Sequence, residues 1–104
     1  MTETDNKNGI TFILKIDPDT ARRYVTGWLI TQVSNVLIGG TAQLVITNQT
    51  LWRVPVLLIS SQAGTVGQVG TVDVDAVTGK LLVNDELIGQ ILHNVKHLVT
   101  PTYS

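Results

Sequence analysis

The sequence predicts an α+β fold, in which a mainly antiparallel sheet of four to five strands packs against two helices. Apolar residues recur at helical spacing in two segments, one early in the chain and one near its end. Between these segments, several short runs alternate apolar and polar residues, as half-buried strands do. The 104 residues have the length of one domain, and the expected order of elements is β-α-β-β-β-β-α.

A strand followed by a long helix is expected at the start of the domain. Residues 10–16 carry large apolar side chains at every second position, the period of a strand with one face on a core. Asp17 can then accept hydrogen bonds from free amide groups at a helix start, and Pro18 gives up no hydrogen bond in the first turn. We predict a helix over 18–37, ended by Gly39-Gly40 because glycine adopts the left-handed cap conformation without steric cost. Its apolar stripe comprises Ala21, Tyr24, Val25, Trp28, Leu29, Val36 and Leu37.

Four strands are expected in the middle of the chain, over residues 42–47, 51–60, 69–75 and 80–83. A loop over 61–67 precedes the third strand, and a tight turn over 75–79 precedes the fourth. Pro55 lacks an amide hydrogen, which favours an edge position or a bulge. From Val56 onward both faces of the second strand are apolar, so we expect that end to be covered on both sides. One face carries Trp52, Val54, Val56 and Leu58, and the other carries Leu51, Arg53, Leu57 and Ile59.

A second helix is expected over residues 85–99. Asn84 is the expected cap, and the acidic residues Asp85 and Glu86 suit the positive end of the helix dipole. One side of this helix is apolar and is expected to pack on the sheet, through Ile88, Ile91, Leu92, Val95 and Val99, with Leu87 and Leu98 at its margin. Glu86, Gln90, His93 and His97 fall on the opposite side.

The composition excludes several classes of protein. A net charge of −1 argues against a nucleic-acid or anionic-membrane partner, and no apolar run is long enough to span a bilayer. Cysteine is absent, which excludes disulfides and thiol catalysis. The polar start of the chain does not have the pattern of a secretory signal, so a cytoplasmic location is expected. We expect one domain over residues 10–99, with flexible tails at 1–9 and 100–104.

Three groups of residues are candidates for chemistry, and each has a structural interpretation that we favour. His93 and His97 have the i, i+4 spacing that can place two imidazoles on one metal, but they also suit a solvated polar face, and a site would need further ligands. Asp73 and Asp75 share a strand face, where Asp75 is expected to bind the amide groups of the following turn while Gly79 supplies a positive φ. The glycine-rich stretch over 64–70 leads into a strand and not into the helix that a phosphate site requires. No nucleophile and base can be paired, so we expect no enzyme. We also expect no metal and no cofactor.

Part of the sequence resembles a PepSY-type domain. The resemblance rests on the segments Trp52-Arg53-Val54-Pro55-Val56 and Val74-Asp75-Ala76-Val77-Thr78-Gly79-Lys80-Leu81, and it covers about residues 18–83. That family combines a tryptophan-led strand, a hairpin reading Val-Asp-Ala-x-Thr-Gly-x-Leu and a helix ahead of the sheet. The resemblance implies this arrangement here. PepSY domains are mostly extracytoplasmic and are thought to modulate peptidases, and no functional residue is carried over.

The low charge favours a protein that acts by association. Only 14% of the residues are charged, against about 25% in typical domains. Several apolar residues lie off the expected core faces, among them Leu57 and Ile59, and they would form exposed patches larger than monomers usually tolerate. We therefore expect a small non-enzymatic protein that acts as a homo-oligomer, and the capping or regulation of a protein partner is left open as a further role.

Two alternatives remain open at this point. The first is a small-molecule-binding module with a cleft between helix and sheet, lined by Tyr24, Trp28 and Trp52. The second is a regulator of a neighbouring enzyme, of the antitoxin or peptidase-inhibitor type.

Overall fold

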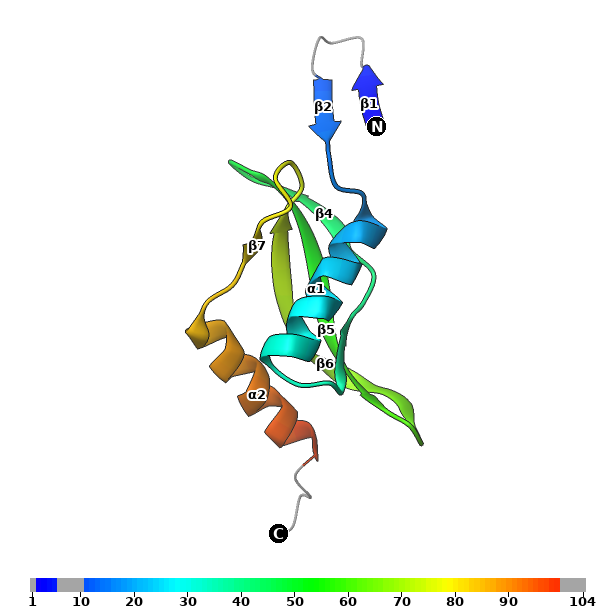
Figure 1. Ribbon diagram of the computed structural model, residues 1–104, viewed down its shortest axis with the longest axis vertical. Helices are drawn as coiled ribbons and strands as arrows, with labels where there is room; N and C mark the ends of the chain where they lie inside the picture. The colour runs from blue at the N-terminus through cyan, green and yellow to red at the C-terminus, as the bar shows by residue number, and fades with distance from the viewer. Residues whose placement is uncertain (1, 6–10, 100–104) are drawn as a thin grey trace.

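A computed structural model describes residues 2–5 and 11–99, and it has the predicted α+β architecture with an antiparallel sheet (Figure 1). Side chains are described for residues 14–98. No helix within these described residues is long and apolar enough to cross a membrane. The elements are β1 (Thr2–Asp5), β2 (Thr11–Leu14), α1 (Pro18–Gln32), β3 (Leu37–Gly39), β4 (Gln43–Ile46), β5 (Thr50–Ser60), β6 (Gly64–Asp75), β7 (Leu81–Leu82) and α2 (Asp85–Val99).

The sheet is built around β5, and every strand pairing in it is antiparallel. One side of β5 pairs with β3 and β4 in succession, and the other side pairs with β6, which in turn pairs with the short β7. Pro55 lies opposite the segment that connects β3 to β4, where neither strand pairs with it. The amide hydrogen that proline lacks is therefore not needed for a hydrogen bond between strands. Two register shifts follow Pro55, after Val56 and after Leu58. The predicted bulge beside Pro55 is therefore present, although β5 is central and not an edge strand.

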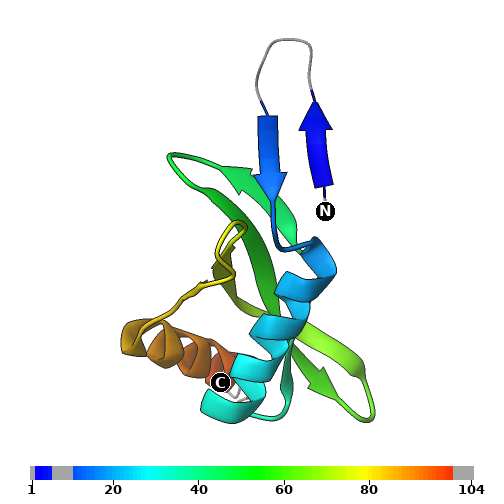
Figure 2. The ribbon, with the colours of Figure 1, turned by 45° about the horizontal axis from the view of Figure 1, so that its top comes forward.

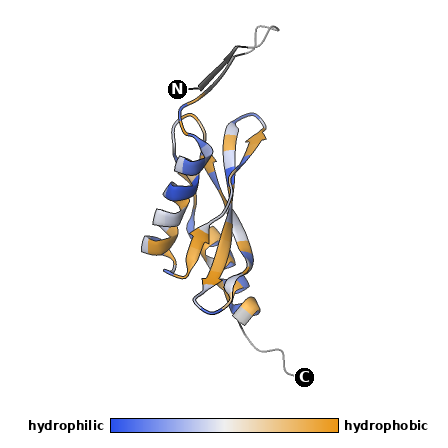
Figure 3. Ribbon diagram, turned by 90° about the vertical axis from the view of Figure 1, so that its right-hand side faces the viewer, coloured by the Kyte–Doolittle hydropathy of each residue, from blue (hydrophilic) through white to orange (hydrophobic). Residues whose placement is uncertain are grey.

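Both helices cover the same face of the sheet (Figures 1 and 2). A Cβ added at Gly39 of β3 would lie 3.0 Å from the backbone oxygen of Arg22 in α1, and one added at Gly70 of β6 would lie 3.1 Å from Ile91 in α2. Figure 3 shows apolar residues concentrated along the strands beneath these helices. The buried core consists of Ala21, Val25, Leu29, Leu37, Trp52, Val54, Val56, Leu58, Val69, Val72, Val74, Ala76 and Ile91.

Helix α1 begins as predicted and ends earlier than predicted. Asp17 accepts a hydrogen bond from the amide of Thr20 at 2.7 Å, and Pro18 is the first helical residue. The predicted end at residue 37 is wrong, because the helix stops at Gln32 and Leu37 opens β3, where it is fully buried and pairs with Leu58. Burial of a leucine within the sheet outweighs the helical spacing that residues 36 and 37 share with the preceding stripe.

The N-terminal residues differ from the prediction in their pairing. We expected a flexible tail over 1–9 and a strand over 10–16 in the main sheet. Instead, Thr2–Asp5 and Thr11–Leu14 form a separate two-stranded sheet, which projects away from the rest of the chain in Figure 1. Alternation identifies a strand but does not name its partner, so the separate hairpin was not predictable from it. The predicted tail at 100–104 lies outside the described residues.

The later elements agree closely with the prediction, apart from the loop between β5 and β6. The strand expected at 69–75 begins at Gly64, so the predicted loop over 61–67 shrinks to a turn of three residues. The Ser60 hydroxyl accepts hydrogen bonds from the amides of Gln62 and Ala63, and Gly64 has a φ of 72°. Helix α2 has the predicted bounds, but Leu87 packs on the core whereas Leu92, expected on the packed side, is exposed.

Candidate functional site

The face of the sheet opposite the two helices is not covered by either of them. Alternate residues of β5 point to the two faces, so Trp52 and Val54 lie under the helices while Leu57 and Ile59 lie on the other side. We call this second side the helix-free face. Within the described residues of one chain, both helices lie on one face of β5, and Leu57 and Ile59 are only half-buried. The expected cover of the second face beyond Val56 is therefore not supplied by these helices.

Five apolar side chains form a continuous row on the helix-free face. Ile38 pairs with Leu57, and the amide of Ile59 donates to the carbonyl of Val36 at 2.9 Å. Residues directly opposite in an antiparallel pair share a face, so these side chains adjoin one another. Val36 is 42% exposed, and the other four members are half-buried. The apolar strip, as we call it, comprises Val36, Ile38, Pro55, Leu57 and Ile59.

Gly40 allows the strip to close over the backbone. Its amide donates to the carbonyl of Pro55 at 2.8 Å. A Cβ at this position would lie 2.9 Å from Cγ of Pro55 and 3.0 Å from Cδ1 of Leu57. A larger residue here would force Pro55 or Leu57 to shift, so glycine allows both side chains to lie close to the backbone of this segment.

An internally neutral ion pair borders the apolar strip. Nε and Nη2 of Arg53 on β5 donate to the two carboxylate oxygens of Asp73 on β6, at 2.9 and 3.0 Å. The hydrogen bonds from Arg53 to this carboxylate raise the pKa of the guanidinium above its usual value. Because each charge of the pair has its partner on the same strand pair, this border adds no net charge to the face.

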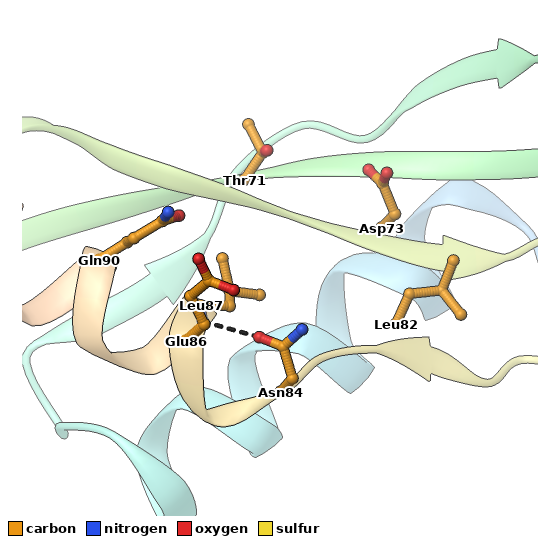
Figure 4. Close-up of a pocket in the computed structure, with 7 residues that line it drawn as sticks. All are labelled: Thr71, Asp73, Leu82, Asn84, Glu86, Leu87 and Gln90. Carbon is orange, nitrogen blue, oxygen red and sulfur yellow. Dashed lines mark hydrogen bonds between the residues drawn. The ribbon is translucent and has the colours of Figure 1, made fainter.

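A cavity of about 330 Å³ lies where α2 approaches the edge of the sheet (Figure 4). It forms because β7 pairs only with Asp73 and Val74, which leaves the rest of that edge of β6 without a partner strand. Asn84 caps α2 by accepting from the amide of Leu87 at 2.8 Å, and this cap fixes one wall. The lining residues are Thr71, Asp73, Leu82, Asn84, Glu86, Leu87 and Gln90. Two carboxylates, two amides and a hydroxyl suit a polar ligand that donates hydrogen bonds.

The aromatic residues predicted to bind a ligand lie elsewhere. Trp52 is 8% exposed, and its indole Nε1 donates to the carbonyl of Ile16 at 2.7 Å. Tyr24 is 45% exposed and lies, with Ile16, against the turn at Gly79, and Trp28 packs at the margin of the core. Ile16 therefore links Tyr24 and Trp52. None of the three aromatic residues lines the cavity of Figure 4.

The remaining candidates have the structural roles that the sequence favours. The carboxylate of Asp75 accepts hydrogen bonds from the amides of Val77 and Thr78 at 2.8 and 2.9 Å, and Gly79 has a φ of 80°, as predicted. These backbone donors, that of Thr78 foremost, lower the pKa of Asp75. Across the side chains described, no three His, Asp or Glu residues gather as metal ligands would.

The fold and surface define a small α+β protein with a sheet covered by helices on one face. Comparison of the chain with protein-family models, curated proteins and solved structures finds no match. The residues that carry the PepSY resemblance lie in β5, at the end of β6, in the turn that follows and at the start of β7. Membership of that family stays a prediction.

Proposed function

We propose that this protein acts by self-association, and that two copies pack their apolar strips against each other across the helix-free faces. The observation that carries this proposal is the strip itself, five adjoining apolar side chains on a sheet face that neither α1 nor α2 covers. Sheets that pack face to face interdigitate such side chains at about 10 Å separation.

The charges near the strip also support a second copy as the occupant. A copy brings the same side chains to the interface, so an unbalanced charge on this border would repel its own symmetry mate. Arg53 and Asp73 neutralise each other within one copy. The whole chain carries a net charge of only −1, so long-range repulsion between copies is small.

The first test places a charge in the strip. Leu57→Glu and Ile59→Glu are expected to convert the assembly to monomers, because each buries a carboxylate without a partner in the interface. Val77→Glu is the matched control, since Val77 is an apolar residue 42% exposed in the turn after β6 and outside the strip. Molar mass from size-exclusion chromatography with light scattering gives the readout, and far-UV circular dichroism checks the fold.

Two results would contradict the proposal. One is a wild-type chain that is monomeric at both low and high protein concentration. The other is an assembly that keeps the mass of the wild type in Leu57→Glu and Ile59→Glu as well as in Val77→Glu. A monomeric wild type that captures one defined protein through the same strip would replace self-association by the capping of a partner, such as the peptidase that the PepSY resemblance implies.

A second candidate function is the binding of a small polar ligand in the cavity of Figure 4. The observation that favours it is the lining, in which Asp73 and Glu86 supply acceptors from two different elements. A panel of amines and sugars is expected to raise the melting temperature of the wild type, and Glu86→Gln is expected to reduce the shift. A panel without any effect, or an equal shift in the variant, would end this candidate. Neither proposal involves catalysis. The cytoplasmic location stays a prediction from the sequence.

A further inference from the structure

Two histidines lie one helical turn apart on the exposed side of α2. The Nε2 atoms of His93 and His97 are 3.0 Å apart, and their rings meet edge to face, with centroids separated by 4.4 Å and planes inclined by 73°. Both side chains are exposed, so the pair takes no part in the core.

The two nitrogens already lie close enough to bind one ion. A metal ion bound to two imidazoles at about 2.0–2.1 Å, with its nitrogens 3.0 Å apart, subtends an angle of about 95° between them. That angle is close to the right angle between neighbouring positions of a square-planar or octahedral centre. Tetragonal sites built from nitrogen and oxygen ligands are typical of Cu²⁺ and Ni²⁺. We propose that His93 and His97 chelate one such ion.

The backbone between the two histidines is fixed by the fold. Ile91 is fully buried beneath α2, against Gly70 of β6. Asn94 donates from Nδ2 to the carbonyl of Val69 at 2.9 Å, which attaches the same turn of the helix to the strand edge. The helix therefore presents both rings from a rigid segment, and less conformational entropy is lost when a metal ion binds.

The surface beside His93 leaves room for further ligands of the ion. A hollow of about 530 Å³ is lined by Glu86, Gly89, Gln90, His93 and Asn94. Gly89 lies one turn before His93, and a Cβ added there would meet nothing within 4 Å. The remaining coordination positions are thus accessible to water or to the oxygen and nitrogen donors of a small molecule.

Coordination changes the tautomer of one ring and turns the two rings so that both Nε2 lone pairs point at the ion. In the hydrogen-bonded pair, one Nε2 carries a hydrogen and the other accepts it. On the metal, both Nε2 lone pairs bind the ion, so the first ring shifts its hydrogen from Nε2 to Nδ1 by exchange with water. Each neutral ring keeps one hydrogen, and no redox step is involved.

Titration of the full chain with CuCl₂, NiCl₂ and ZnCl₂ in a non-chelating buffer tests this site. Isothermal calorimetry is expected to give one ion per chain, with Cu²⁺ bound tightest and Ni²⁺ bound more tightly than Zn²⁺. Cu²⁺ is expected first because nitrogen and oxygen sites generally bind it tightest, and Ni²⁺ is expected next because it favours the same right-angled geometry. His93→Gln and His97→Gln are each expected to weaken Cu²⁺ binding roughly 10²-fold, because one ligand alone loses the chelate.

Electron paramagnetic resonance of the Cu²⁺ complex gives a second readout, in which an axial signal split by two nitrogens is expected. Asp85→Asn is the control, since Asp85 is an exposed carboxylate in the first turn of α2 and lies outside the hollow. It is expected to leave affinity within about twofold, because the two imidazoles supply the chelate. Equal Cu²⁺ affinity in the wild type and in both histidine variants would overturn the site, as would Zn²⁺ binding more tightly than Ni²⁺. The site is independent of the apolar strip, so neither result bears on self-association.

Discussion

At the scale of single residues, the local hydrogen bonds followed directly from the sequence. Asp17, Asp75 and Asn84 each accept from an amide two or three residues ahead, as predicted. Such bonds depend only on nearby residues, so residue type and position define them. The bond from Trp52 to the carbonyl of Ile16 joins residues 36 apart and was not predictable, because nothing local sets that approach.

Asp75 makes stability depend on pH in acid. Its pKa is lowered from 3.8 by the amides of Thr78 and Val77, so the folded state favours the ionised carboxylate. This contribution is complete above about pH 4, near the unfolded pKa, and is lost as the pH falls through the lower folded value. Asp75→Asn keeps the acceptor and removes the titration.

The urea concentration at the unfolding midpoint is measured between about pH 6 and pH 2. As the pH is lowered, this midpoint is expected to fall less steeply for Asp75→Asn than for the wild type. Asp17 titrates in the same direction in both proteins, because the amide of Thr20 lowers its pKa as well. Parallel curves for the two proteins would show that the turn does not depend on the charge of Asp75.

At the scale of elements, periodicity predicted both helices and the strands of the main sheet, while helix length and strand pairing needed the fold. Leu37 has helical spacing to Val33 and Leu29, yet it pairs with Leu58 in the sheet. The cavity beside α2 was missed for a similar reason. The cavity arises because β7 pairs with only two residues of β6. The sequence has no pattern that marks where the pairing of two strands ends.

Gly27 within α1 and Gly39 of β3, which packs against α1, are expected to respond in opposite directions to substitution by alanine. Gly27 lies within the helix, and a Cβ there meets nothing within 4 Å, so Gly27→Ala is expected to raise the free energy of unfolding by about 0.5–1 kcal/mol. A Cβ at Gly39 would lie 2.9 Å from Cγ1 of Val54 and 3.0 Å from the Arg22 carbonyl oxygen. Gly39→Ala is therefore expected to cost about 1–3 kcal/mol.

Chemical denaturation of both glycine variants provides the measurement. The comparison is direct because each substitution adds the same methyl group. A destabilised Gly27→Ala, or an unaffected Gly39→Ala, would mean that the approach of α1 to β3 is looser than these distances indicate.

At the scale of the whole molecule, the fold consists of one helix-covered sheet and a separate N-terminal hairpin. The fold class and the antiparallel main sheet were predictable from the alternation of strands and helices. The one-sided covering was not, because the apolar residues of β5 beyond Val56 are the same whether a helix or another molecule covers them. Self-association through Leu57 and Ile59 was expected from the sequence, and the structure adds Val36, Ile38 and Pro55 beside them on the helix-free face.

The N-terminal hairpin is expected to contribute little to stability. β1 pairs with β2 and with no strand of the main sheet. Deletion of residues 1–9 is therefore expected to lower the free energy of unfolding by less than about 1 kcal/mol, because an isolated two-stranded hairpin is marginal in water. Urea denaturation of the shortened chain checks this, and a loss of several kcal/mol would indicate that β1 supports the core.

The long β5–β6 pairing has a consequence for how the chain reaches its native state. These strands of 11 and 12 residues are consecutive, and only Ser61–Ala63 separate them. Closing so short a connection costs little entropy, whereas β3 and the two helices must reach the sheet from further away along the chain. We expect the centre of the chain to organise first and both flanks to dock afterwards. Substitutions at Val54 or Val72 would then slow folding, while those at Leu29 would mainly accelerate unfolding.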